Sequence, residues 1–291
     1  MSAFISADPT VAPKRADRLP FGLGLAAGAV AFAIFLGTPG VAFAAESTEI
    51  SARRVTERKI FSDNEIMNGF FKIAFGAELQ TTGRTDRVRK YAAPVRVYVD
   101  NRSKVDRRAE LAAVVADIRA RVKNLDIEIT PDRNLANVKV TLVRDRDLAQ
   151  TIRRFYGRER AEQIQRSLNP QCLSGFRKDE SYRIVSSDVI IVADAGDFLF
   201  RDCAYEELLQ ALGPINDDAS VPWTMFNDDV SMGFFDVYDQ YLLNILYDPR
   251  VRPGMTAAEV RALLPQVLPT VRTWIADING LAQESNDPAR H

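Results

Sequence analysis

Residues 205–217, YEELLQALGPIND, hold the side chains whose types and spacing are best suited to chemistry. Glu206 and Gln210 are four residues apart, so on a helix they lie one turn apart on the same side. With Asn216 they offer carboxylate and amide oxygens, which suit Ca²⁺, Mg²⁺ or Mn²⁺ and not a tight zinc site. Glu207, directly after Glu206, is a further carboxylate in this stretch.

The same stretch also has a structural interpretation. An apolar core stripe at helical spacing is formed by Tyr205, Leu208, Leu209 and Leu212. Glu206 and Gln210 lie off this stripe, and they form either the wall of a site or an ordinary solvated face. A cation site would also need Asp217 or Asp218, because one carboxylate and two amides bind weakly.

The census of histidine and cysteine excludes several kinds of chemistry. The only histidine is His291, the last of 291 residues, and there are two cysteines. Ser-His-Asp and Cys-His systems need an imidazole base, and a zinc site takes His or Cys ligands. We therefore expect no cofactor and no zinc, and at most weakly bound Ca²⁺ or Mg²⁺.

The charge pattern argues against a nucleic-acid ligand, and the glycine pattern argues against a phosphate group bound by a Gly-rich loop. The net charge is −1 and the chain has no long basic stripe, so we expect no nucleic-acid partner. A Gly-rich phosphate loop is also absent from the sequence. The acidic pair Asp228 and Asp229 has the character of turn-forming residues, although paired carboxylates also serve glycosidases.

The amino terminus has the pattern of a secretory signal peptide over residues 1–44. Three basic residues at 14–18 precede sixteen apolar or glycine residues at 21–36, and 42–44 form a small-x-small cleavage site. We expect cleavage there and a periplasmic or secreted protein. An uncleaved membrane anchor is the alternative, and it is the only membrane contact that we expect.

Export changes the interpretation of the two cysteines. In an oxidising compartment Cys172 and Cys203 most simply form one disulfide. Two free thiols are the alternative.

Hydrophobic periodicity predicts the elements that position these residues. Helices are expected over 62–75, 106–124, 145–158, 159–168, 197–212, 234–246 and 256–278, and strands over 94–99, 126–130, 138–143 and 182–193. Strands in the middle and helices at the end predict an α+β fold, or a mixed α/β fold, with a single mixed sheet. We divide the chain beyond the signal peptide into an N-terminal helix and linker (45–90), a globular domain (91–280) and a flexible tail (281–291).

The candidate site resembles the helix motif of the metzincin zinc endopeptidases, H-E-x-x-H-x-x-G-x-x-H. Glu207 and Gly213 match the glutamate and the glycine bend of that motif. All three metal positions differ, because they hold Glu206, Gln210 and Asn216.

Two later segments extend this resemblance. Met225, in VPWTMF, resembles the methionine of a Met-turn, and Tyr238 and Asp239 open a YDxxLLxxLY segment. The chain is also similar to exported alphaproteobacterial proteins with domain of unknown function 2927, whose EELxQALG, ND and YDxxLLxxLYDPRxRPGM segments occur at 206–213, 216–217 and 238–255. That resemblance implies secretion and a zincin-like fold with an upper α/β part and a C-terminal helical part, but it implies no known activity.

The resemblance implies a metalloprotease fold whose metal site is degenerate. We expect a non-catalytic pseudoprotease that binds a peptide, a protein or a cell-wall ligand at the cell envelope, with Gly213, Tyr238 and Asp239 supporting the fold. Two alternatives remain open. One is a peptidase-like hydrolase that uses Glu207 as general base with an oxygen-ligated divalent ion, and the other is a purely structural envelope protein.

Overall fold

The computed structural model describes residues 47–75, 87–167, 171–214 and 216–282. The predicted signal peptide, much of the predicted linker and nearly all of the predicted tail lie outside these residues. The description below concerns the compact unit that residues 45–291 form. Among the described residues, no helix is both long enough and apolar enough to cross a membrane.

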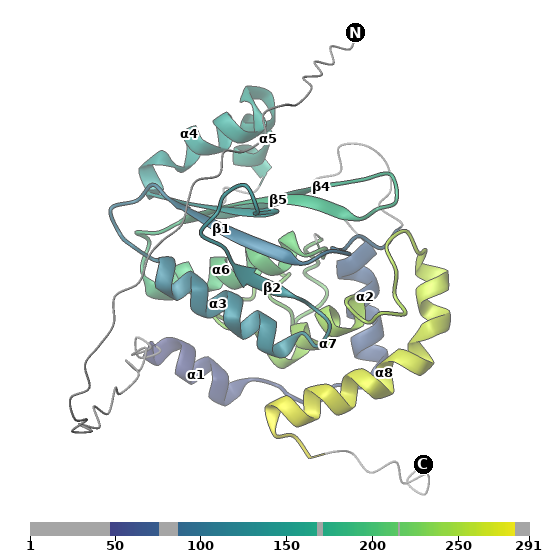
Figure 1. The fold of residues 1–291 in the computed structure, drawn as a ribbon. Helices are drawn as coiled ribbons and strands as arrows, with labels where there is room; N and C mark the ends of the chain where they lie inside the picture. The colour runs from purple at the N-terminus through teal and green to yellow at the C-terminus, as the bar shows by residue number, and fades with distance from the viewer. Residues whose placement is uncertain (1–46, 76–86, 168–170, 215, 283–291) are drawn as a thin grey trace, which may run out of the picture. The chain divides into compact units, whose positions relative to one another are not determined.

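One mixed five-stranded sheet forms the centre of this unit (Figure 1). Its strands are β1 (Val95–Asn101), β2 (Ile127–Ile129), β3 (Val138–Val143), β4 (Cys172–Lys178) and β5 (Ile184–Val192). Their order is β2-β1-β3-β5-β4, and β4 alone runs antiparallel to its neighbour. β4 therefore lies at one edge of the sheet, and no described strand pairs with its outer side.

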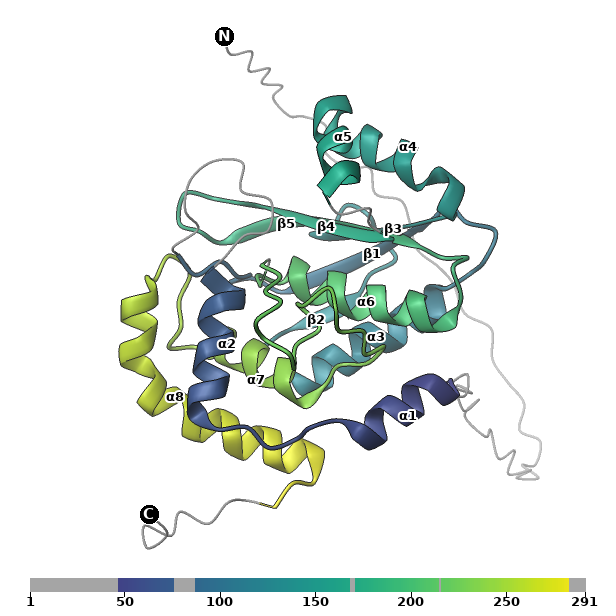
Figure 2. The same cartoon turned by 180° about the vertical axis from the view of Figure 1, so that it is seen from behind.

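Helices cover both faces of the sheet (Figures 1 and 2). α4 (Asp145–Tyr156) and α5 (Arg158–Ser167) lie over one face, where Leu148, Ile152 and Ile164 form a small separate core with β3 and β5. The other face carries α3 (Arg108–Arg121) and α6 (Asp197–Ala211). Beyond them lie α1 (Thr48–Thr56), α2 (Asp63–Phe75), α7 (Val237–Leu246) and α8 (Ala257–Asn279).

The structure confirms the single mixed sheet, and its parallel pairs β1–β2, β1–β3 and β3–β5 make the fold mixed α/β rather than α+β; two segments also differ from the expectation. β4 was not expected, because its Ser-Gly centre interrupts the apolar alternation that marks a strand. α1 was not expected either, since only Ile50 of that helix is buried. The predicted capping box at the start of α8 is present, with Thr256 and Glu259 bonded reciprocally. Pro265 and Pro269 both lie inside α8.

A glycine in the middle of α2 makes the close contact between α2 and α7. The Tyr238 hydroxyl donates a hydrogen bond to the Glu65 carbonyl oxygen at 2.7 Å, and its ring packs edge-on against Phe61. A Cβ on Gly69 would lie 2.0 Å from the Tyr238 hydroxyl oxygen. Tyr238, predicted from the family resemblance to support the fold, thus fits against a helix surface that lacks a side chain.

We expect Gly69→Ala to lower the free energy of unfolding by about 1–3 kcal/mol, because it overpacks this contact. Alanine at an exposed helix position would instead stabilise a helix by about 1 kcal/mol relative to glycine. Chemical denaturation measures the sign directly. Two controls sharpen the result: Asn68→Ala, one residue earlier on the exposed face of α2, should cost nothing, and adding Tyr238→Phe should restore part of the stability.

Candidate functional site

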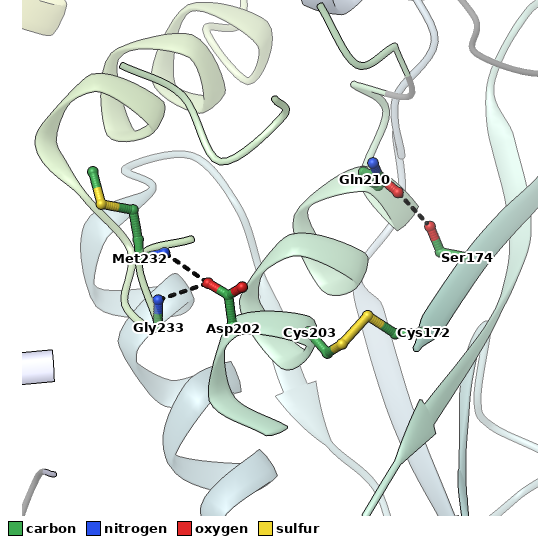
Figure 3. Close-up of a disulfide and its surroundings, with 7 residues drawn as sticks. All are labelled: Cys172, Ser174, Asp202, Cys203, Gln210, Met232 and Gly233. Atoms are coloured by element: carbon green, nitrogen blue, oxygen red, sulfur yellow. Dashed lines mark hydrogen bonds between the residues drawn. A yellow bond between two sulfur atoms is a disulfide. The ribbon is translucent and has the colours of Figure 1, made fainter. Parts of the chain in front are cut away.

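The candidate site is built on α6, whose two polar faces contact different parts of the chain. One face is fixed to β4 by the Cys172–Cys203 disulfide and by a hydrogen bond from the Ser174 hydroxyl to Gln210 Oε1 (Figure 3). The predicted disulfide is therefore present. Glu207 lies one turn after Cys203, so helical spacing places it on this same face, where it is 5% exposed.

The second face of α6 holds the loop of residues 216–236, which we call the site loop. The Asp202 carboxylate accepts hydrogen bonds from the backbone N–H groups of Met232 and Gly233 (Figure 3). Two turns later, the Gln210 amide donates to the carboxylate of Asp217 at 3.0 Å. Both ends of the site loop are thus anchored to the stripe of α6 that also includes residue 206.

Between these two anchors, three carboxylates converge. Glu206, Asp217 and Asp228 each offer an oxygen atom, and these atoms all lie within 4.8 Å of one another. We call them the carboxylate cluster. Burial raises the pKa of Glu206 well above its ordinary value, and the charges of Glu207, Asp217, Asp202 and Asp228 raise it further. Glu206 therefore binds its proton unusually tightly, and a cation at this position would be favoured.

The sequence predicted three oxygen ligands, and the structure brings only one of them to the cluster. Gln210 uses its amide oxygen for Ser174 and its amide nitrogen for Asp217. The Asn216 amide donates to the Lys72 carbonyl oxygen at 3.0 Å. Glu206 is grouped instead with Asp217, which was considered as a helper, and with Asp228, which was interpreted as a turn residue.

The glycine bend and the Met-turn-like segment frame the site. Gly213 has φ +142° and ends α6 with its N–H bonded to the Gln210 carbonyl oxygen. Met225 is buried, and its backbone N–H donates to Asp239 in α7 at 2.8 Å. The Thr224 hydroxyl donates to the other oxygen of the same carboxylate. Asp239 thus holds the site loop in place.

Sequence reasoning missed Asp202 and Ser174 as anchors, and it placed Asp228 correctly in a turn without its approach to Glu206. The spacing of Asp202, Glu206 and Gln210 at i, i+4 and i+8 was a readable signal for a polar stripe along α6. No comparable signal existed for Asp228, because the loop brings it back to α6 from a position 22 residues beyond Glu206. Ser174 could not be predicted as an anchor either, because the strand that carries it was not expected.

The fold and site together define a mixed α/β domain with carboxylates collected beside one helix. Residues 63–266 match the family described as "Protein of unknown function (DUF2927)", which is well over half of the chain. The chain belongs to this family. No curated protein and no solved structure matches the chain.

Proposed function

We propose that this protein is an exported, zincin-like domain that binds an extended polypeptide without cleaving it. The observation that carries the proposal is that the two amide side chains of the motif, Gln210 and Asn216, are both engaged in hydrogen bonds to other parts of the chain. Gln210 bridges Ser174 and Asp217, and Asn216 is bound to Lys72. Two of the three positions that hold metal ligands in the metzincin motif thus serve structure here, since Gln210 links α6 to β4 and to the site loop, and Asn216 links the site loop to α2.

The arrangement of sheet and helix supports the zincin-like part of the proposal. The metzincin resemblance implies a cleft along a sheet edge, above the motif helix. Here the antiparallel edge strand β4 lies beside α6, and the disulfide joins the two. A strand edge offers backbone N–H and C=O groups to an extended chain, which is the binding mode called strand addition.

Two features support export. The chain begins with the pattern of a secretory signal peptide. Cys172 and Cys203, its only cysteines, are paired, and disulfides persist in oxidising compartments. Mass spectrometry of the protein recovered from the producing cell tests cleavage before residue 45.

The central test of the binding proposal is a pair of Glu207 variants. We expect Glu207→Gln and Glu207→Ala to bind short labelled peptides with less than a tenfold change in affinity, about 1.4 kcal/mol. Neither variant nor the wild type should cleave those peptides. Fluorescence anisotropy measures binding, and mass spectrometry of the same mixtures measures cleavage. Peptides with N-methylated backbone amides are the control, and they should bind much less tightly if strand addition is the mode.

Wild-type cleavage that disappears in Glu207→Gln would reject the non-catalytic proposal. It would favour the second candidate, a hydrolase with Glu207 as general base and an oxygen-ligated divalent ion. The observation in favour of that candidate is the carboxylate cluster, whose oxygens lie within 4.8 Å of one another. Elemental analysis for a stoichiometric ion, and a melting temperature that falls with chelator, distinguish the two candidates.

A further inference from the structure

Two carboxyl groups are buried together at the start of α7. Asp236 is 1% exposed and Asp239 is fully buried. One oxygen of Asp236 caps the helix by accepting from the N–H groups of Tyr238 and Asp239. Both oxygens of Asp239 hold the site loop, through the Thr224 hydroxyl and the Met225 N–H.

The second oxygen of Asp236 has no donor to accept from among the described groups. The carboxyl of Asp239 is buried in the same first turn of α7, and the Asp239 backbone N–H donates to the first oxygen of Asp236 at 3.1 Å. Two unprotonated carboxylates in this position would repel each other in a site from which water is excluded. A proton on one of the two carboxyl groups removes this repulsion while the loop is docked.

The charged groups around the pair do not supply a compensating cation. Glu57, which precedes α2, faces Asp236 and accepts from the Val237 N–H. Glu206 of α6 faces Asp239, and Tyr238 lies beside both acids. Among the described residues, neither Asp236 nor Asp239 forms an ion pair. The nearest basic groups act on Glu57 and Tyr238 rather than on the pair: Arg54, Arg58 and Lys59.

We propose that the Asp236–Asp239 pair is a pH-sensitive latch for the site loop. With one proton shared, Asp239 holds Thr224 and Met225, and the loop keeps Asp217 and Asp228 beside Glu206. Loss of the proton at higher pH places two adjacent negative charges in the core. The loop then detaches at Met225, and the carboxylate cluster opens.

The titration behaviour of both groups agrees with this latch. Burial raises the pKa of Asp236 well above its ordinary value, and the neighbouring Asp239 raises it further. Burial also raises the pKa of Asp239 to about 6, against the lowering effect of its hydrogen bonds from Asp236, Thr224 and Met225. Aspartate in an unfolded chain has a pKa of about 3.9. The folded state binds protons more tightly, so stability falls as the pH rises above about 4.

Asp236→Asn tests the latch, because the amide copies the protonated acid and cannot titrate. We expect the wild-type melting temperature to fall by roughly 5 °C between about pH 5 and pH 8. In D236N this fall should be much smaller. Hydrogen exchange of the Met225 amide, corrected for intrinsic rates, should accelerate with pH in the wild type and stay constant in D236N.

Two further variants separate the latch from other acids. Asp229→Asn changes an exposed acid in the same loop and should keep the wild-type profile. Glu206→Gln removes the other strongly perturbed acid and should leave exchange at Met225 pH-dependent. The latch is wrong if E206Q alone abolishes that dependence, or if D236N and the wild type have parallel profiles. Wild-type amide exchange that does not change with pH after correction also rejects it, whether or not D236N folds.

Discussion

Gly213→Ala is expected to lower the free energy of unfolding by about 3–5 kcal/mol, because it combines backbone strain with a backbone clash. The φ of Gly213 is +142°, a conformation that residues with a side chain rarely adopt. A Cβ there would lie 2.3 Å from the Arg89 carbonyl oxygen and 3.0 Å from Leu246 Cδ2. A backbone oxygen cannot move aside as a flexible side chain does, so the strain would spread to both segments.

Gly280→Ala is the matched control for this prediction. Gly280 also has a positive φ, +61°, but a Cβ added there meets no atom within 4 Å. Its substitution should cost about 1–2 kcal/mol, the cost of the left-handed conformation alone. Denaturant titration of both variants separates strain from clash. If the two substitutions cost the same, the contact with Arg89 contributes nothing and the tight bend is not required.

The sequence predicts that the helix ends at Gly213, but it does not show why this position must be a glycine. Gly213 follows a helix with an apolar stripe and precedes Pro214, so the end of α6 was predictable from local signals. The contact with the Arg89 carbonyl oxygen joins residues more than a hundred positions apart. Local patterns carry no information about which backbone segment will pass close to a glycine.

In the candidate site, too, the elements set by neighbouring residues were predictable, and the contacts between distant segments were not. Most helices of the domain were predicted because each carries a periodic apolar face. The carboxylate cluster depends on where a long loop crosses α6, and the spacing of Asp217 and Asp228 in the sequence does not fix that crossing. The edge strand β4 was missed for a physical reason as well. An edge strand buries less of its surface, so Ser174 and Gly175 interrupt the alternation by which strands are recognised.

These distant contacts give the site loop two kinds of anchor. Asp202 and Gln210 hold it to α6 by hydrogen bonds that local helical spacing aligns. Asp239 holds it to α7 through a buried carboxylate. Burial raises the pKa of Asp202 as well, although its bonds from Met232 and Gly233 oppose that effect. A pKa that is raised in the folded state means that stability is lost as the pH rises, so ionisation of Asp202 and ionisation of the Asp236–Asp239 pair both weaken the attachment of the loop.

The double substitution Cys172→Ala with Cys203→Ala should lower the free energy of unfolding by about 3–4 kcal/mol, because the crosslink restricts the unfolded chain. The bridge spans 31 residues and joins β4 to α6. We expect a fall in melting temperature of roughly 10 °C for a domain of this size. Differential scanning calorimetry of the oxidised wild type and the double variant gives the value.

A loss of stability alone would not tell whether the bridge also positions the binding edge. Ser174→Ala removes the second link between the same two elements, and the loss of that one hydrogen bond should cost about 1 kcal/mol. If the bridge fixes β4 over Glu207, hydrogen exchange in β4 should rise in the double cysteine variant well below its melting temperature, and peptide affinity should fall with it. Unchanged exchange in β4 would mean that the bridge acts on the unfolded chain only. Peptide binding on that edge would then depend on the β4–β5 pairing and not on the disulfide.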